Sequence, residues 1–108
     1  MGKGYWIVTQ QNIPDQNLYA RYAKLAKTTL EEFNGRSVIA GNKEENYEDS
    51  EVGLRTVIVE FDNYEIAVAA YNRRSYKKAM GSLNGTLKRE FRIIRTQFSI
   101  IDKNGTRS

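Results

Sequence analysis

Residues 55–71, with the sequence RTVIVEFDNYEIAVAAY, decide the fold because they change from the pattern of a strand to the pattern of a helix. In the first part, β-branched and aromatic side chains alternate between two faces, which is typical of a strand. One face carries Val57, Val59 and Phe61, and the other carries Thr56, Ile58 and Glu60. Because both faces are largely apolar, we expect a strand that is covered on both sides.

The helix that follows begins near Asp62 or Asn63, either of which can cap a helix through its side-chain oxygen. Glu65 stands three residues after Asp62, as the second member of a capping box would. Apolar residues then recur at helical spacing, so one side of this helix should face a core. The residues expected there are Ile66, Ala67, Ala70 and Tyr71.

Glu60 sets the strand apart because it places a carboxylate in an apolar run. Such a group needs water, an opposite charge or hydrogen-bond donors, since a buried unpaired charge costs several kcal/mol. Three interpretations are open: an ion pair with an arginine such as Arg55, Arg36 or Arg92, a solvated strand face, or an acid or base in a pocket with a shifted pKa. On the third interpretation, an acid or base in a pocket, Glu60 is the candidate catalytic residue.

The composition excludes several kinds of enzyme chemistry. The 108 residues include no cysteine and no histidine, which excludes disulfides, thiolate nucleophiles and the usual zinc and haem ligands. We therefore expect no metal and no cofactor. Acid–base or covalent work would fall to Asp, Glu, Lys, Tyr, Ser or Thr.

The sequence contains no run of about eighteen apolar residues, which is the length needed to cross a membrane. Its first residues also lack the pattern of a secretory signal. We therefore expect a cytoplasmic protein with no membrane partner. The net charge of +4 is mild, and it permits nucleic acid or an acidic ligand as a partner without requiring either.

The same two periodicities predict the remaining elements. Asp15 can cap a helix with an apolar stripe that ends near Phe33, and Asn34 with Gly35 is a helix stop. The further expected elements are a first strand over residues 4–11, a short strand over 37–41, a short helical piece over 76–83 and a last strand over 91–98.

This order of elements, strand, helix, strand, strand, helix, strand, is that of ferredoxin-like α+β folds with a four-stranded antiparallel sheet. We expect one domain over residues 1–101 and a polar C-terminal tail over residues 102–108. The acidic segment 42–53 is expected to be a loop.

Right-handed crossovers would place both helices on one face of the sheet and leave the other face bare. That face would carry isoleucine, valine and aromatic side chains, and large exposed apolar patches are uncommon on monomers. A second copy of the chain across a two-fold axis could cover it. A stacked nucleic acid is the other possible cover.

Several short motifs resemble the bacterial domain-of-unknown-function family 1330. They are Gly4-Tyr5-Trp6-Ile7, Asn34-Gly35-Arg36, the strand at residues 55–61, and Tyr71 followed by Tyr76. The resemblance covers residues 3–98 and implies a dimeric α+β barrel, a group that includes cofactor-independent monooxygenases and small-molecule isomerases. The family's own activity is not established.

The resemblance carries six residues as site candidates. Glu60 is the catalytic candidate, and the ligand-binding candidates are Trp6, Arg36, Arg55, Tyr71 and Tyr76. Large aromatic side chains dominate packing, which favours the core or an interface over ligand contact for the three aromatic residues. The two arginines could bind a carboxylate or phosphate, or could pair with Glu60 or the acidic loop. The chain departs from the family's Arg-Gly-Gly turn at Ala40-Gly41-Asn42.

We expect a homodimer that binds a small organic molecule between sheet and helices, as a cofactor-independent oxygenase or an isomerase. The alternative is a basic nucleic-acid-binding module that uses Arg73, Arg74, Lys77 and Lys78. Against it, the strand at residues 55–61 lacks the glycines and paired aromatics of an RNA-binding sheet, and Glu60 would repel phosphate. A structural dimerisation module without a ligand is a third possibility.

Overall fold

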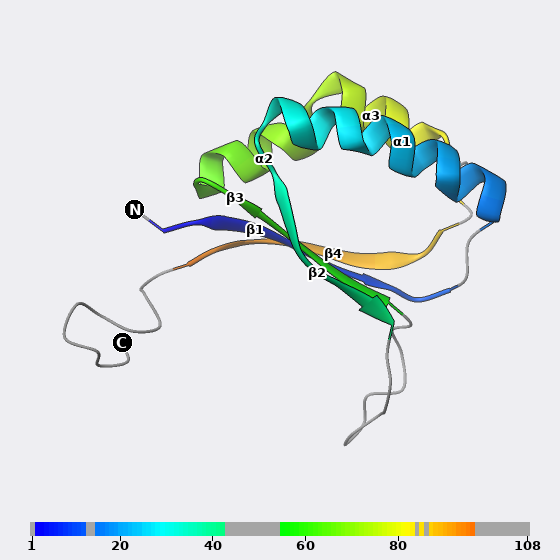
Figure 1. The fold of residues 1–108 in the computed structure, drawn as a ribbon, viewed down its shortest axis with the longest axis horizontal. Helices are drawn as coiled ribbons and strands as arrows, with labels where there is room; N and C mark the ends of the chain where they lie inside the picture. The colour runs from blue at the N-terminus through cyan, green and yellow to red at the C-terminus, as the bar shows by residue number, and fades with distance from the viewer. Residues whose placement is uncertain (1, 13–14, 43–54, 84, 86, 97–108) are drawn as a thin grey trace, which may run out of the picture.

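The computed structural model describes residues 2–12, 15–42, 55–83, 85 and 87–96. It contains seven elements in chain order (Figure 1). They are β1 (Gly4–Gln10), α1 (Gln16–Glu32), β2 (Arg36–Asn42), β3 (Arg55–Phe61), α2 (Tyr64–Asn72), α3 (Arg74–Gly81) and β4 (Arg89–Arg95).

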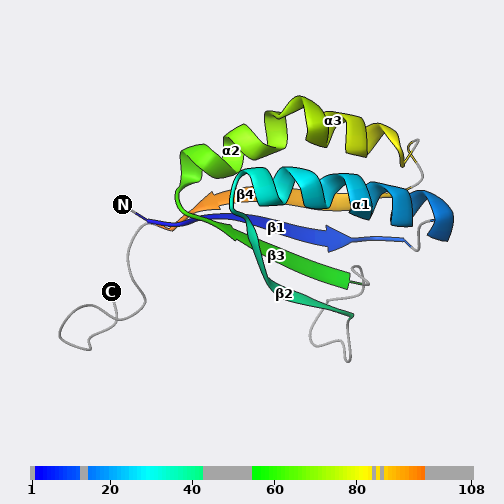
Figure 2. The ribbon, with the colours of Figure 1, turned by 45° about the horizontal axis from the view of Figure 1, so that its top comes forward.

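The four strands form one antiparallel sheet in the order β2-β3-β1-β4. This is the strand order of a ferredoxin-like fold, as the element pattern predicts. Figure 2 shows that α1, α2 and α3 all lie on one face of the sheet. Within the described part of the chain, no helix lies on the other face.

Helix α1 begins and ends at polar signals that the sequence displays. Asp15 caps it, because its side-chain oxygen accepts a hydrogen bond from the Leu18 amide at 3.0 Å. Asn34 ends the helix in the left-handed conformation, with φ of 56°. At Gly35, an added Cβ would lie 2.8 Å from the Phe61 ring, so only glycine allows the chain to turn this closely past β3.

The second helical region is two short helices. Asn63 caps α2 by accepting from the Ile66 amide at 2.8 Å. Because Asn63 is the cap, Glu65 is not in the capping-box position expected from Asp62. Arg73 takes an extended conformation between α2 and α3, with ψ of 140°, so the chain changes direction there.

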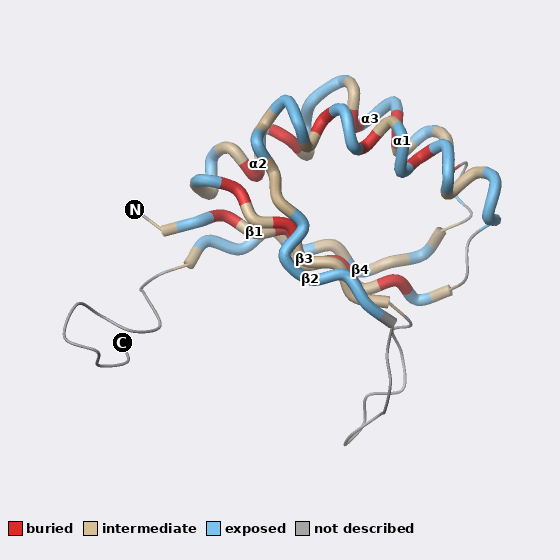
Figure 3. The backbone as a smooth tube through the Cα atoms, viewed as in Figure 1, coloured by how far each residue is buried: buried red, intermediate tan, exposed pale blue. Residues whose placement is uncertain are grey.

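The core lies between the helices and the sheet (Figure 3). Its largest fully buried residues are Tyr76, Phe61 and Thr29. Cross-strand register explains how the sheet contributes: Trp6 lies opposite Val59 on one side and Ile93 on the other, all on the helix-facing side. α2 packs on β1, β3 and β4, whereas the backbone of α1 lies closest to α3.

The described residues confirm most of the predicted boundaries. β3 spans the predicted residues, and β2 is one residue longer at each end. The expected last strand at 91–98 is corrected to Arg89–Arg95, so it begins two residues earlier than predicted. Helix α3 also begins two residues earlier than predicted, at Arg74. The expected loop at residues 42–53 is corrected at its start, because Asn42 is the last residue of β2; the rest of that loop and the tail at 102–108 lie outside the described residues.

In the described ranges, no helix has the length and apolar character needed to cross a membrane.

Candidate functional site

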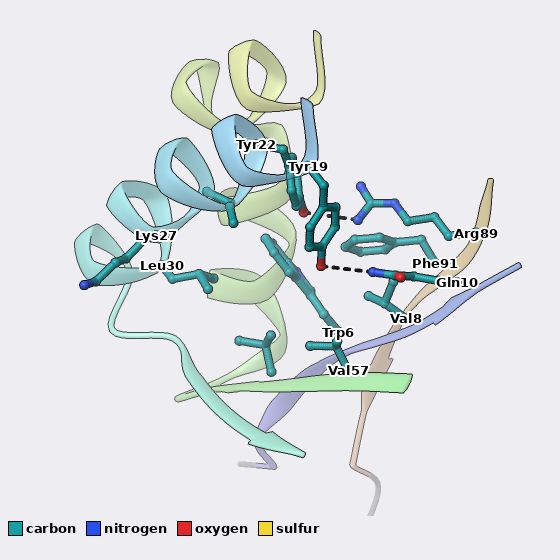
Figure 4. Close-up of a pocket in the computed structure, with 13 residues that line it drawn as sticks. Trp6, Val8, Gln10, Tyr19, Tyr22, Lys27, Leu30, Val57, Arg89 and Phe91 are labelled. Atoms are coloured by element: carbon teal, nitrogen blue, oxygen red, sulfur yellow. Dashed lines mark hydrogen bonds between the residues drawn. The ribbon is translucent and has the colours of Figure 1, made fainter. Parts of the chain in front are cut away.

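A cavity of about 200 Å³ lies between α1 and the helix-facing side of the sheet (Figure 4). It exists because α1 rests on α3 and spans the sheet without close backbone contact. Its lining is mostly apolar and aromatic, with a few polar groups, as is usual for small-molecule sites. The lining residues are Trp6, Val8, Gln10, Tyr19, Tyr22, Ala23, Ala26, Lys27, Leu30, Val57, Val59, Arg89 and Phe91.

The wall of the cavity is built around Trp6, which projects from β1 toward the helices. Its indole Nε1 donates to the Ala67 carbonyl at 2.8 Å, which fixes the ring against α2. The ring packs against Phe61, Tyr76 and Phe91 with centroid separations of 5.0, 4.9 and 5.1 Å. Tilted aromatic contacts of this kind add to the free energy of burial and make the wall rigid.

One end of the cavity is polar. The Tyr22 and Tyr76 hydroxyls lie 2.7 Å apart, and Arg89 donates from Nη1 to Tyr22 at 3.1 Å and from Nη2 to Tyr76 at 2.9 Å. Beside them, the Gln10 amide donates to the Tyr19 hydroxyl at 3.0 Å. Figure 4 shows Gln10, Tyr19, Tyr22 and Arg89 gathered on one side of Trp6, with Leu30 on the other side; Tyr76 lies behind the lining and does not line the cavity itself.

Burial determines the charge state of this polar end. Burial and the neighbouring Tyr22 hydroxyl raise the pKa of Tyr76 well above its ordinary value, so Tyr76 stays protonated at neutral pH. Burial opposes the charge of Arg89, but Tyr22 and Tyr76 outweigh it and hold the pKa of Arg89 above its usual value. The polar end of the cavity therefore has a cation beside the protonated hydroxyl of Tyr76.

Glu60 and Arg36 lie on the opposite face of the sheet. Arg36 Nη2 is 3.0 Å from a Glu60 carboxylate oxygen, and the Tyr5 hydroxyl donates to the other oxygen at 2.8 Å. This confirms the ion-pair interpretation of Glu60 with Arg36 as its partner. The hydrogen bonds from Tyr5 and then from Arg36 lower the pKa of Glu60, so its carboxylate is ionised at neutral pH.

The six site candidates thus fall into two groups on opposite faces. Trp6 and Tyr76 belong to the helix-facing side, where they contact each other. Tyr71 is close by, 5.6 Å from Tyr76 between ring centroids, and lines a second, more open hollow that it shares with Arg89 and Phe91. Tyr71 is not among the residues that line the cavity itself.

Arg55 lies at the first position of β3, opposite Gln10, and does not line the cavity. Arg36 and Glu60 cannot contact a ligand in the cavity of the same chain, because the sheet stands between them. Within one chain, the candidates therefore do not form a single pocket.

The basic cluster of the nucleic-acid alternative surrounds a surface hollow at the junction of α2 and α3. Arg73 pairs with Glu32 at 2.8 Å, and the Lys77 ammonium lies 3.8 Å from the centre of the Tyr71 ring. Arg74 and Lys78 are exposed. The cluster is on the helical side, away from the bare sheet face, so the two features expected to bind nucleic acid together are separated.

Two central groups of the cavity, Arg89 and Tyr22, are not among the site residues predicted from the sequence. Tyr22 belongs to the apolar stripe of α1, and its hydroxyl gives no signal in that pattern. Arg89 falls just before the predicted start of the last strand. Extending the alternation of Phe91 and Ile93 back by two residues would have placed Arg89 on the helix-facing side.

The fold and the aromatic cavity define the class of protein as a ferredoxin-like α+β domain. Residues 3–97 match the model of the family described as "Domain of unknown function (DUF1330)", and the chain belongs to this family. No curated protein matches the sequence at significant similarity.

Several solved structures share the fold. A protein of unknown function from Rhodopseudomonas palustris has a TM-score of 0.69 at 15% identity, covering 91% of this chain and 85% of that one. A dimeric ferredoxin-like protein of unknown function from Jannaschia sp. CCS1 has a TM-score of 0.67 at 13% identity, covering 88% and 100%. SnoaB, a cofactor-independent oxygenase from Streptomyces nogalater, has a TM-score of 0.62 at 7% identity, covering 94% and 100%.

Proposed function

We propose that this chain forms a homodimeric α+β barrel that binds a small organic molecule in the cavity between α1 and the sheet. The observation that carries the proposal is the cavity itself, with its aromatic wall at Trp6 and a polar end at Arg89 and Tyr22. A mostly apolar hollow with a few converging polar groups is the usual form of a small-molecule site.

The dimer is supported by the bare face of the sheet. Register places Ile39, Ile58 and Ile7 in one row across three neighbouring strands of this face. Ile39 is 52% exposed and Ile94, on the same face, is 43% exposed, which leaves apolar surface that a second sheet could cover. The Jannaschia neighbour is described as dimeric and shares the fold.

We propose a cofactor-independent oxygenase as the first activity to test, with an isomerase as the second. The fold shared with SnoaB supports this order. Trp6 and Tyr76 would shape the site, while Glu60 and Arg36 would face the second copy across the barrel. The lowered pKa of Glu60 keeps its carboxylate ionised at neutral pH, so it would accept hydrogen bonds there and would not act as a proton donor.

Native mass spectrometry of the freshly purified protein tests both parts of the proposal. We expect a dimer that carries an additional small-molecule mass, which dissociates under activation and can then be identified. A strictly monomeric protein would contradict the barrel. A dimer that carries no adduct and does not change on incubation with small aromatic compounds would contradict the binding function.

A further inference from the structure

Arg89 is a partly buried cation that makes no ion pair with a carboxylate of the described residues. Among the described residues, the ion pairs with carboxylates are made by Arg36, Arg73, Arg92 and Arg95. Arg89 instead donates to two tyrosine hydroxyls and to the Met80 sulfur, all neutral. An enclosed charge without a counter-ion is costly, so a site that keeps one usually uses it.

Counted over the part of the chain that the structure describes, the hydrogen bonds of this cluster leave donors unfilled. A guanidinium has five N–H groups, and the described residues accept from three of those of Arg89, leaving Nε–H and one Nη1–H. Each tyrosine hydroxyl accepts from Arg89, and only one of the two hydrogens can serve the bond between Tyr22 and Tyr76. The unfilled groups are therefore all donors.

The geometry also decides which of the two tyrosines has a hydroxyl hydrogen without an acceptor in the cluster. Tyr76 is fully buried, so its hydroxyl hydrogen must point at the Tyr22 oxygen to be satisfied. Tyr22 lines the cavity, and its own hydrogen is then free to point into it. A hydroxyl that accepts from both Arg89 and Tyr76 is polarised into a stronger donor.

The charges of the other residues around the cavity also favour a ligand that accepts hydrogen bonds. None of the residues that line it is acidic, and Lys27, at the end opposite Arg89, points its ammonium outward, away from Trp6 (Figure 4). Along the sheet, register places Gln10 between Arg55 and Arg89, so a further cation lies next to the polar end. The face toward the ligand is thus rich in donors and positive charge.

The volume of the cavity limits the size of the ligand. An apolar cavity of about 150 Å³ holds one benzene molecule. At about 200 Å³, this cavity has room for one ring with a small substituent. Trp6 and Phe91 offer it flat aromatic surfaces, and Val8, Val57 and Leu30 complete an apolar wall.

We propose that the cavity binds an anionic molecule built on a single ring, such as an aromatic carboxylate, with its anionic group at Arg89 and Tyr22 and its ring against Trp6. This proposal rests on the proposed function, because it specifies the ligand of the same cavity. A carboxylate there would accept from the unfilled donors and supply the missing counter-charge.

Trp6 makes the proposal directly measurable, because it is the single tryptophan of the chain and it lines the cavity. Fluorescence excited selectively at tryptophan can be titrated with benzoate and with benzamide, its neutral analogue of nearly the same shape. We expect benzoate to bind with a Kd about tenfold or more lower than that of benzamide, since hydrogen bonds to a charged partner are the stronger ones.

Substitutions of Arg89 test whether this residue causes the preference for benzoate over benzamide. Arg89→Gln should remove it, so that the two Kd values agree within about twofold, and Arg89→Lys should restore part of it. Arg21→Gln is the matched control, because Arg21 is exposed on α1 next to Tyr22 in sequence and the substitution removes the same charge. Circular dichroism and thermal melting verify that each variant is folded.

Equal binding of the two probes by the wild-type protein would overturn the anion proposal and leave the cavity as a binding site for organic molecules. This comparison needs no variant, so it decides even if Arg89→Gln does not fold. A preference for benzoate that persists in folded Arg89→Gln would overturn the role of Arg89. If neither probe changes the Trp6 signal, the proposed function fails together with the anion proposal.

Discussion

Glu60 stands out in the sequence as a carboxylate in an apolar strand, and side chains of the neighbouring strands supply its hydrogen-bond partners. Its carboxylate accepts hydrogen bonds from Tyr5 on the neighbouring strand β1 and from Arg36 on the neighbouring strand β2. Register requires this arrangement, since Arg36, Glu60 and Tyr5 lie directly opposite one another across three strands. Side chains in such a row share a face and come into contact.

The depressed pKa of Glu60 predicts a pH dependence of stability. A carboxyl whose pKa is lower in the folded state than its ordinary value of 4.5 contributes stability at pH values above 4.5. That contribution is lost as the pH falls through the folded-state pKa. We expect Glu60→Gln to cost about 1 kcal/mol at neutral pH, and to melt with a weaker dependence on pH below 4.5 than the wild type, as followed by circular dichroism.

Glu90→Gln is the control for this prediction. Glu90 also pairs with an arginine, Arg92 at 3.2 Å, but both side chains are largely exposed. Water screens an exposed pair, so this variant should keep the wild-type slope. If Glu60→Gln and the wild type lose stability in parallel below pH 4.5, the network does not contribute as described.

At the scale of the element, the start of α2 is the boundary at which the sequence pattern changes from that of a strand to that of a helix. The sequence offers two capping residues in succession, Asp62 and Asn63, and the structure uses the second. Asp62 turns instead toward Arg36, at 3.3 Å in an exposed ion pair. The choice shifts the first turn of the helix by one residue and brings the buried Ala67 and Ala70 onto the sheet.

Asn63→Ala should therefore destabilise the protein by about 1 kcal/mol, because the Ile66 amide loses its acceptor. Asp62→Ala is the matched control and should cost less, since it removes only an exposed ion pair. Urea unfolding measures the free energy of unfolding of each variant, and the two values can be compared when the two m-values are equal. Equal losses for the two variants would show that the cap is shared or lies at Asp62.

Periodicity predicted the elements well where one face is apolar and the other polar, and less well where charged residues enter a strand. β3 has its predicted bounds because its alternation is regular from Arg55 to Phe61. β4 begins earlier than predicted because Arg89 does not look like a core residue in the sequence. The separate helical piece after α2 was predicted, but its start at Arg74 was not, since no glycine or proline marks the break at Arg73.

At the scale of the whole molecule, the sheet divides the predicted site residues between two environments. Alternation shows that Glu60 and Val59 point to opposite faces, but it cannot show which face the helices cover. That assignment depends on the tertiary packing of Trp6 and Phe61 under α2. For this reason the sequence could name the residues of a site without showing that they belong to two surfaces.

The bare face has a regular pattern of its own. The row of Ile39, Ile58 and Ile7 lies next to the row of Arg36, Glu60 and Tyr5, and Ile94 continues the second row on β4. Apolar side chains at its centre favour burial against a second sheet, and Arg36 and Glu60 would keep each other as partners when desolvation raises the cost of their charges. Two copies related by a two-fold axis would bury the same rows against each other.

Ile58→Asp tests this arrangement, because it places a carboxylate in the middle of the isoleucine row. We expect the dimer dissociation constant to rise by at least about tenfold, since each copy would have to bury an unpaired charge. Light scattering after size exclusion measures the change, and Thr28→Asp, on the exposed side of α1, is the control. A folded Ile58→Asp variant that remains as dimeric as the wild type would place the interface elsewhere. Because the cavity lies on the opposite face, the monomer should still change its Trp6 fluorescence with benzoate, which would separate ligand binding from assembly.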